Sequence, residues 1–457
     1  MNTIVEPKDH IIKLWGKQQT GEDNAFRMLK YVLQADYEKQ LLLLNVVTGQ
    51  LVVLNPIEVE VLHSLPCKYC KAMDQLIDGH FLVPEKYNEH QQVVKMREIL
   101  MKLEEVQRKP GISHYTILPT TACNARCYYC FEQGSKTVTM TEDTAKAIVE
   151  FIINHCNEDK DVSLSWFGGE PTVAASRIDQ ICKGLLQKGI RYRSEITTNG
   201  YLFDPEMIKR AKELWKLERV KIAVDGTEKT YNATKAYVGV TDNPYKRVLE
   251  NVGRFLEHGI KVTMRMNFDL GNYLEFPSLV NELKTLYHDC SLLRLNVHPV
   301  VGEYPNKQGE VLHGNDAWFE GKIVELNEVA RKAGLIKSKH GLPCLKFHGC
   351  QAINDSAVVI TPEGNLVRCP EQFGDDQITG NIWQGVTNKE LVSSWKEIGD
   401  YSMCHNCALF PDCLRISRCS AQTRCCFSKE KHKQYLESMK HNMCSYKNIK
   451  EERNDDV

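Results

Sequence analysis

Three cysteines stand close together in the segment CNARCYYC: Cys123, Cys127 and Cys130. Thiolates at this spacing on one short loop can hold one corner of a cubane iron–sulfur cluster. Because three thiolates ligate three of the four irons, one iron stays open. An open iron can chelate the amino and carboxylate groups of a methionine moiety, and a low-potential cluster can deliver the electron that cleaves a sulfonium. A zinc ion completed by a distant residue is the alternative, although zinc prefers paired CxxC segments.

A second group of cysteines stands near the end of the chain. The sequence has 18 cysteines, and its first residues lack the apolar core of a signal peptide. We therefore expect a reducing compartment, where clustered thiols usually indicate a metal site. Iron–sulfur clusters and interleaved four-cysteine zinc sites both fit such a group. The group consists of Cys344, Cys350, Cys369, Cys404, Cys407, Cys413, Cys419, Cys425, Cys426 and Cys444.

The other cysteines carry weaker signals. Cys156, Cys182 and Cys290 stand alone in helix-like or strand-like sequence, which predicts small buried apolar side chains. Cys67 and Cys70 form a single CxxC without a second pair, so we do not expect them to hold a metal.

The elements that position the first cysteines follow a strand-then-helix pattern. Helical stretches separate the strand-like runs, and Asp204 before Pro205 predicts the start of one helix. Six such units predict an α/β fold with parallel strands, as an open sheet or most of a barrel, and an active site at the carboxyl ends of the strands. The first four strands lead into CNARCYYC, GGEP, TNG and Asp225-Gly226. The strand-like runs begin near His114, Val162, Tyr192, Val220, Lys261 and Leu292.

The CxxxCxxC spacing, with GGEP after the next strand, resembles the radical S-adenosylmethionine (SAM) enzymes. The resemblance covers residues 111 to about 335 and implies a partial (β/α)6 TIM-like barrel. It implies that Tyr129, just before the last cysteine, lies against the adenine of SAM. The GGEP segment is implied to hydrogen-bond the methionine amino group, with Gly168, Gly169, Glu170 and Pro171 as the corresponding residues.

Four further positions rest mainly on their place at strand ends. Asn199 and Asp225 are each followed by Gly and could be ordinary turn residues, but we expect them at the SAM site. Relatives typically have Ser-x-Asp-Gly on the fourth strand, whereas this chain has Ala223, which puts the matching hydroxyl contact in doubt. Arg265 and Asn267 alternate on a strand that should be buried. They either reach the SAM carboxylate or form a structural salt bridge.

The C-terminal cysteines resemble the SPASM domain, an extension of peptide-modifying radical enzymes that holds two auxiliary four-iron clusters. The match rests on Cys350, Gly364 and Cys369 and on the CxxC of residues 404–407 followed by Cys413. The family usually places the next cysteine three residues later, whereas here five residues intervene before Cys419.

The resemblance implies one set of four cysteine ligands for each auxiliary cluster. The first set is Cys344, Cys350, Cys369 and Cys419, and the second is Cys404, Cys407, Cys413 and Cys444. Whether Cys425 or Cys426 replaces Cys419 or Cys444 is left open by the irregular spacing.

Residues 1–110 form a separate predicted unit. Short strand-like runs around VVTGQ, followed by helix-like sequence, predict a small α+β domain. Its pattern and position resemble leader-binding modules of ribosomal-peptide maturases, which could capture an extended peptide at a sheet edge. A packing role without a ligand is the alternative. We therefore expect three domains: residues 1–110, the radical SAM barrel at 111–335, and the SPASM domain at 336–457.

Composition excludes several classes of function. The 457 residues carry a formal net charge of -1, which predicts no attraction to nucleic acid. No apolar run is long enough to span a membrane, so we expect a cytoplasmic protein without a membrane partner.

Together these features predict a radical SAM enzyme that modifies a ribosomal precursor peptide. The expected cofactors are SAM and three 4Fe-4S clusters, supplied with electrons by a low-potential donor such as flavodoxin or ferredoxin. The expected product is a cross-linked peptide. An anaerobic sulfatase maturase is the first alternative, although such enzymes generally lack a 110-residue N-terminal extension and have a base aspartate where this chain has Pro370. A non-catalytic metal or redox-sensing protein is the second. The sequence identifies neither the substrate, the bond formed, a general base nor the oligomeric state.

Overall fold

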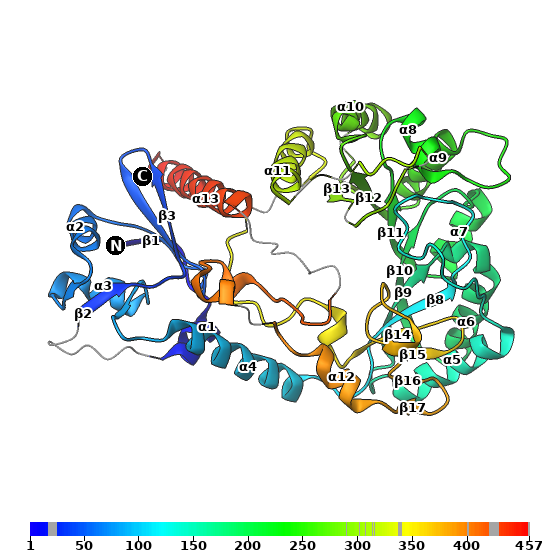
Figure 1. The fold of residues 1–457 in the computed structure, drawn as a ribbon, viewed down its shortest axis with the longest axis horizontal. Helices are drawn as coiled ribbons and strands as arrows, with labels where there is room; N and C mark the ends of the chain where they lie inside the picture. The colour runs from blue at the N-terminus through cyan, green and yellow to red at the C-terminus, as the bar shows by residue number, and fades with distance from the viewer. Residues whose placement is uncertain are drawn as a thin grey trace. The chain divides into compact units, whose positions relative to one another are not determined.

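The computed structural model shows two compact units, which we describe separately (Figure 1). Unit 1 comprises residues 1–108, 338–349 and 397–457, and unit 2 comprises residues 109–337 and 350–396. The structure describes residues 1–16, 25–288, 290–300, 302–306, 308–312, 314, 316–336, 341–399, 402–419 and 429–455.

Unit 2 is built on a mixed sheet of ten strands in the order β13-β12-β11-β10-β9-β8-β14-β15-β16-β17. Neighbouring strands from β8 to β13 are parallel, and β14 joins the other side of β8 in parallel, so the predicted α/β fold with a mostly parallel sheet is confirmed. The six central strands are β8 (His114–Thr120), β9 (Asp161–Gly168), β10 (Arg191–Thr198), β11 (Leu217–Ala223), β12 (Lys261–Phe268) and β13 (Leu293–Pro299).

Apolar and polar side chains alternate along the strands of this sheet, so one face is apolar. Helices pack against that face. Leu293, Leu295 and Val297 of β13 are buried in the core, whereas Arg294 and His298 point to the other, exposed face. Figure 1 shows α5, α6 and α7 along the outer side of the sheet. The helices are α5 (Glu142–His155), α6 (Ala175–Gln187), α7 (Pro205–Glu213), α8 (Glu228–Lys235), α9 (Pro244–Glu257), α10 (Phe276–Tyr287) and α11 (Asp316–Lys332).

Short antiparallel strands extend the sheet beyond β14. The Asp204 carboxylate accepts a hydrogen bond of 2.7 Å from the Met207 amide, which confirms the predicted cap of α7. The remaining elements of unit 2 are β14 (Ala357–Ile360), β15 (Asn365–Val367), β16 (Gly380–Asn381), β17 (Gly385–Val386) and α12 (Lys389–Trp395).

Unit 1 has its own core around two small antiparallel sheets. Their strand orders are β1-β5-β4-β3 and β6-β2-β7, and the long helix α13 contributes the buried Met439 and Met443 to the core. The elements are β1 (Asn2–Val5), α1 (Asp9–Trp15), β2 (Ala25–Met28), β3 (Val32–Tyr37), β4 (Gln40–Asn45), β5 (Leu51–Val53), α2 (Pro56–Ser64), β6 (Cys67–Lys68), α3 (Asp74–Asp78), β7 (Leu82–Pro84), α4 (Glu89–Gln107) and α13 (Lys429–Asp455).

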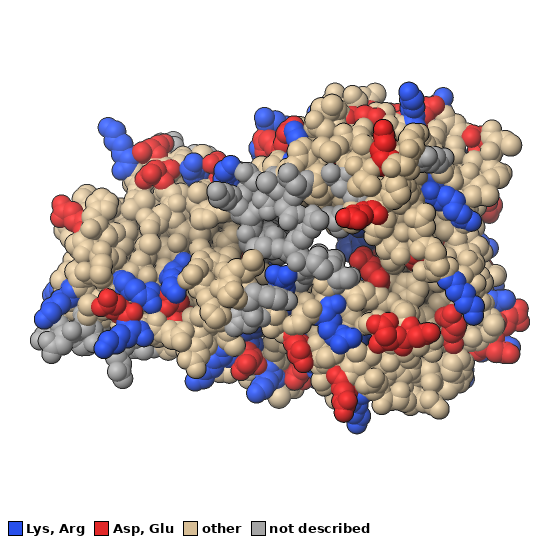
Figure 2. Space-filling view, viewed as in Figure 1, with Lys and Arg blue, Asp and Glu red and all other residues tan. Residues whose placement is uncertain are grey.

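The face of the molecule seen in Figure 2 is mixed in charge. Figure 2 shows acidic and basic side chains interspersed over the visible face, in line with the net charge of -1. Among the described helices, none is both long and apolar enough to cross a bilayer.

Candidate functional site

The loop after β8 carries Cys123, Cys127 and Cys130 at the carboxyl end of the parallel strands. All three thiols are partly buried, and the Ala125 amide donates a hydrogen bond to the Cys123 sulfur (3.4 Å). Burial raises the pKa of Cys123 to about 12 and also raises the pKa of the other two thiols. A cation is therefore needed to hold these groups as thiolates, which is what a bound iron–sulfur cluster would supply.

The two glycines of GGEP let β9 end against this cysteine loop. Gly168 has φ of +114°, and a Cβ there would lie 2.3 Å from the carbonyl oxygen of Thr120. A Cβ on Gly169 would lie 2.5 Å from the carbonyl oxygen of Ala122. The Glu170 amide donates to this same Ala122 carbonyl (2.9 Å). Only glycine allows so close an approach of the two backbones.

Glu170 is fully buried and links the ends of β9 and β10. One carboxylate oxygen accepts from the hydroxyls of Thr172 (2.5 Å) and Thr198 (2.7 Å), and the other accepts from the Asn199 amide (2.7 Å). Burial raises the pKa of Glu170, although these hydrogen bonds oppose the shift. The carboxylate thus links the two loops. The hydrogen bond expected from the GGEP segment to the methionine amino group stays a prediction. Pro171 follows at the start of a short 3-10 turn.

Asn199 lies beside the cysteine loop, as predicted for the end of the third strand. Its amide nitrogen donates to the side-chain oxygen of Asn124 (2.7 Å) and lies 3.9 Å from the Cys123 sulfur. The structure therefore brings the third strand exit to the first.

Asp225, at the end of β11, is the centre of a buried polar network. Its Oδ2 accepts from the Tyr129 hydroxyl (2.5 Å) and from the Lys235 ammonium (2.9 Å), while Oδ1 accepts from the Asn267 side chain (2.9 Å). The Tyr129 hydroxyl also accepts from Lys235 and from Asn267, each at 3.0 Å. The cysteine loop, β11, α8 and β12 are therefore joined at Tyr129.

The charge of Lys235 is maintained by this network. Burial disfavours the ammonium, but Asp225, Cys127 and Tyr129 together outweigh it and raise the pKa of Lys235 well above its usual value. The carbonyl oxygen of Lys235 also accepts from the Arg126 amide (2.8 Å), so both its backbone and its side chain contact the cysteine loop.

Arg265 of β12 presents an unused donor next to this network. Its Nε is buried and has no hydrogen-bond partner among the described residues. Burial lowers the pKa of Arg265, while the charges of Glu371 and Asp225 oppose the shift. Asn267, which was expected to share the role of Arg265, instead donates to Asp225 and Tyr129. A free guanidinium donor fits the carboxylate of a ligand such as SAM.

Comparison with known proteins identifies the central region. Residues 117–281 match the family model of the Radical SAM superfamily. They form a radical SAM domain. A curated relative, Fe-coproporphyrin III synthase of Methanosarcina barkeri (strain Fusaro / DSM 804), is 27% identical over 165 residues, 36% of this chain and 39% of that protein. The chain spans about two fifths, 39% and 40%, of the first two curated relatives that it matches.

Solved structures share the fold over a longer stretch. The protein anSMEcpe with bound AdoMet and Cp18Cys peptide has a TM-score of 0.54 at 16% identity, covering 74% of this chain and 99% of that one. Streptococcus suis SuiB bound to precursor peptide SuiA has a TM-score of 0.50 at 16% identity, covering 85% and 94%. At these identities the likeness concerns the fold alone.

Outside the radical SAM domain, the predicted ligands of the first auxiliary cluster are divided between the two units. Cys350 and Cys369 belong to unit 2, whereas Cys344 and Cys419 belong to unit 1. Among the described residues, which include Cys123, Cys127 and Cys130, no three His, Cys, Asp or Glu side chains are grouped so that they could hold a metal ion. The assignment of this cluster stays a prediction.

The predicted ligands of the second auxiliary cluster all belong to unit 1. Cys404, Cys407 and Cys413 lie on one turn-rich loop, where the Cys407 amide donates to the Cys404 carbonyl (3.1 Å). Arg97 of α4 anchors this loop by donating to the Cys413 carbonyl (2.9 Å). These three cysteines therefore share one loop, and their assignment as cluster ligands stays a prediction.

Cys444 lies elsewhere on helix α13. The residue is exposed and lies near Tyr37 of β3. Tyr435 of α13 donates a hydrogen bond to Asp412 of the 404–413 loop. Cys444 stands nine residues further along the helix, which corresponds to about 13 Å. Its role as a ligand stays a prediction. Cys425 and Cys426 lie outside the described residues.

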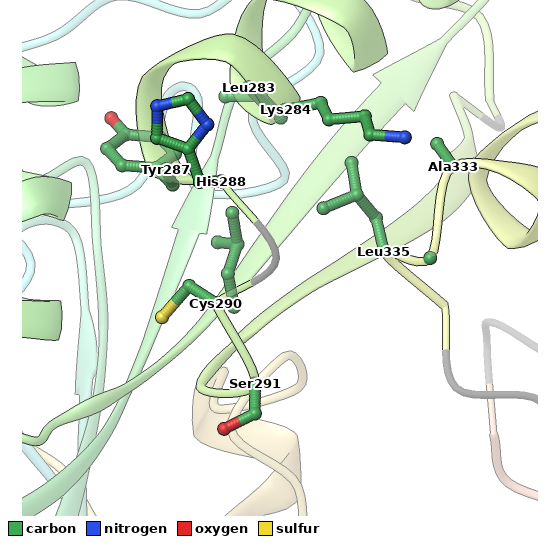
Figure 3. Close-up of a pocket in the computed structure, with 10 residues that line it drawn as sticks. Leu283, Lys284, Tyr287, His288, Cys290, Ser291, Ala333 and Leu335 are labelled. Atoms are coloured by element: carbon green, nitrogen blue, oxygen red, sulfur yellow. The ribbon is translucent and has the colours of Figure 1, made fainter.

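The remaining cysteines differ in their burial. Cys182 is buried, as predicted. Cys290 is partly buried and lines a cavity of about 110 Å³ at the amino end of β13, next to Tyr287 and Leu335 (Figure 3). Cys70 is exposed.

The sequence did not reveal Lys235. It stands at the end of the helix-like segment TEKTYNATK, where a lysine is ordinary because the helix dipole favours a cation. The sequence nevertheless carried a signal. The helix begins soon after Asp225-Gly226, so the last residue of the helix can lie close to the aspartate.

Proposed function

We propose that this protein is a radical SAM maturase of a ribosomal precursor peptide. When bound, a cluster and SAM supply a 5'-deoxyadenosyl radical that abstracts hydrogen from the peptide, and the product carries a thioether, ether or carbon–carbon cross-link. The observation that carries the proposal is the convergence of Cys123, Cys127 and Cys130 with the GGEP turn and the Asp225 network at the carboxyl ends of β8 to β12.

The residues at these strand ends fit a SAM-binding cluster. Cys123, Cys127 and Cys130 would ligate three irons, and Tyr129, held through its hydroxyl, would present its ring to the adenine. The unpartnered Nε of Arg265 supports a contact to the methionine carboxylate. Their roles are to bind and orient SAM.

The C-terminal cysteines would hold two auxiliary clusters that accept the electron left after cross-linking, or ligate a substrate thiolate. The SAM-binding cluster would receive its electron from flavodoxin, ferredoxin or a similar donor. Zinc at the C-terminal cysteines is the competing assignment.

A peptide substrate is supported by the N-terminal sheet. Strand β3 is an edge strand, pairing with β4 only among the described strands. An open groove of about 520 Å³ beside it is lined by Gln34, Asp36 and Gln40 and by Val59 and His63 of α2. An extended leader could add to this edge through main-chain hydrogen bonds. We propose leader recognition for residues 1–110, SAM chemistry for 111–335 and the auxiliary clusters for 336–457.

The experiment is anaerobic reconstitution of the full chain. Three four-iron clusters predict about twelve irons per chain. Replacing Cys123, Cys127 and Cys130 together with Ala should remove about a third of the iron and all release of 5'-deoxyadenosine. Mass spectrometry of the peptide encoded next to the gene should show loss of hydrogen.

Three results would redirect the proposal. Stoichiometric zinc would exclude the auxiliary clusters. Formylglycine in a sulfatase peptide would establish the alternative of a sulfatase maturase. A colourless preparation that never releases 5'-deoxyadenosine would indicate the non-catalytic alternative.

A further inference from the structure

Basic side chains gather on the face of the parallel sheet that lies opposite its helices. The buried partners on alternate positions, such as Val220 and Ile222 of β11 and Met264 of β12, pack into the core on the helical side. The polar positions therefore share the other face. We call five of its side chains the basic face: Arg219 and Lys221 of β11, Lys261 and Arg265 of β12, and Arg294 of β13.

Strand register arranges these charges in layers below the SAM site. Arg265 is opposite Ala223, two residues before Asp225. Lys221 and Arg294 both lie opposite Thr263, one layer further down. Two residues of strand span about 7 Å, so this second layer is within reach of a side chain of a substrate that occupies the site.

Among the residues that the structure describes, the basic face has fewer acidic neighbours than cations. Glu195 of β10 accepts from both Arg219 (3.3 Å) and Lys221 (2.8 Å), and Glu371 is the acidic neighbour of Arg265. Five cations against these two carboxylates leave an excess of three positive charges, or two when Arg265 contacts the SAM carboxylate as proposed above. Lys261 and Arg294 are exposed and form no ion pair with a described residue.

The arrangement has an energetic cost that an anionic ligand would relieve. Arg219 lies directly opposite Lys261 on the neighbouring strand, and like charges in this position are destabilising. Even with its ion pair, the Arg219 side chain is 51% exposed and that of Lys221 is 45% exposed. Both can therefore contact a ligand without displacement of the protein core.

We propose that the basic face binds an acidic stretch of the precursor peptide and so selects for Asp and Glu near the modified residue. The inference rests on the proposed peptide substrate. A peptide is favoured over a nucleic acid because the net charge of the whole chain is -1, which supplies no long-range attraction to a polyanion. The cations are instead confined to one sheet face beside the site.

The test is fluorescence anisotropy on the reconstituted full chain. The probe is a short fluorescein-labelled peptide of alternating Glu and Gly, and the reference replaces Glu with Lys. The acidic peptide should bind at least about tenfold more tightly, and added salt should weaken its binding. Replacing Lys221 and Arg294 together with Gln should reduce this affinity about tenfold. The matched control replaces Lys183 and Lys209, which are exposed on α6 and α7, with Gln. It should leave the affinity for the acidic peptide unchanged.

Charge reversal keeps the test decisive if the Gln variant is poorly folded. Replacing Lys221 and Arg294 with Glu should transfer the preference to the Lys peptide, with iron content and circular dichroism as folding controls. Equal affinity for both peptides, or equal losses in the two Gln variants, would overturn the proposal. The proposal would also be overturned if a uridine oligonucleotide bound more tightly than the acidic peptide and the same variants abolished that binding. Release of 5'-deoxyadenosine and modification of the natural precursor are measured separately, so a failure of the proposed function is distinguishable.

Discussion

At the scale of single residues, Lys235 and Asp225 form the buried ion pair on which the cysteine loop depends. Lys235 is 4% exposed and Asp225 is fully buried. A buried ion pair of this kind gives little net stability by itself. Removal of one partner is nevertheless strongly destabilising, because the other charge stays buried without a counter-charge. Tyr129 is held between the two charges, so its placement at the candidate SAM site depends on both.

Replacing Lys235 with Met should lower the free energy of unfolding by about 3–5 kcal/mol, because Asp225 would be left buried without a cation. Urea unfolding followed by circular dichroism measures this. The control is Lys229→Met on the same helix, whose exposed side chain should cost no more than about 0.5 kcal/mol. The double variant with Asp225→Asn should regain part of the loss. Equal costs for Lys235→Met and Lys229→Met would show that the ion pair does not position the loop.

Cys444 tests the assignment of the second auxiliary cluster. If Cys444 is a ligand, Cys444→Ala should lower the iron content of the reconstituted chain by about a third. Cys425→Ala and Cys426→Ala should keep full iron. Cys70→Ala, which removes another exposed thiol, is the matched control. Full iron in Cys444→Ala together with a loss in either neighbour would transfer the ligand role to that neighbour.

At the scale of elements, the turn after β9 brings the second strand exit against the first. Gly168 combines a positive φ with a backbone approach that no other residue allows. Glu170 then fastens the turn to β10 from the other side. The turn thus holds the carboxyl ends of neighbouring strands together, and it is also a candidate contact of SAM.

Gly168→Ala should destabilise the protein by more than about 2 kcal/mol and weaken SAM binding, because the new methyl group collides with the Thr120 carbonyl. Gly189→Ala is the control, since Gly189 also has a positive φ (+73°) but has no atom within 4 Å of the added Cβ. It should cost about 1 kcal/mol and leave SAM binding unchanged. Urea unfolding and equilibrium dialysis with labelled SAM measure the two effects. The same cost at both glycines would argue against close packing at Gly168.

At the scale of the whole molecule, the N-terminal residues share a unit with the end of the chain. Residues 1–108 form their core together with Leu409, Phe410, Met439 and Met443. Deletion of residues 1–110 would expose these side chains, so a truncated enzyme would be a poor test of leader capture. A point substitution at the sheet edge is more informative.

Asp36→Pro should remove an outward amide of β3 while leaving the β3–β4 pairing intact. Asp36 pairs with Leu41, whose carbonyl bonds to Leu54 instead, so the Asp36 amide points to the free edge. If the leader adds to this edge, binding of the full precursor should weaken about tenfold or more. Asp36→Ala, which keeps the amide, is the control. Release of 5'-deoxyadenosine without peptide monitors the integrity of the radical SAM domain, and equal affinity of both variants would leave this domain a packing role.

The sequence by itself determined the parallel α/β fold and the cysteine loop at its carboxyl edge. Both follow from local rules: the apolar period of strands and helices, and the spacing of Cys123, Cys127 and Cys130 on one loop. The turn after β9 could also be predicted, because the residues of GGEP are contiguous in the sequence.

Only the tertiary structure decided which side chains meet across strands. Lys235 contacts Tyr129, which is 106 positions away in the sequence, and no local pattern encodes that pairing. The same holds for Glu170. Its carboxylate can connect the ends of β9 and β10 only because the register of these two strands brings the ends together. The basic face likewise exists only once the strands are aligned, because alternation puts each charge on a face but register makes them neighbours.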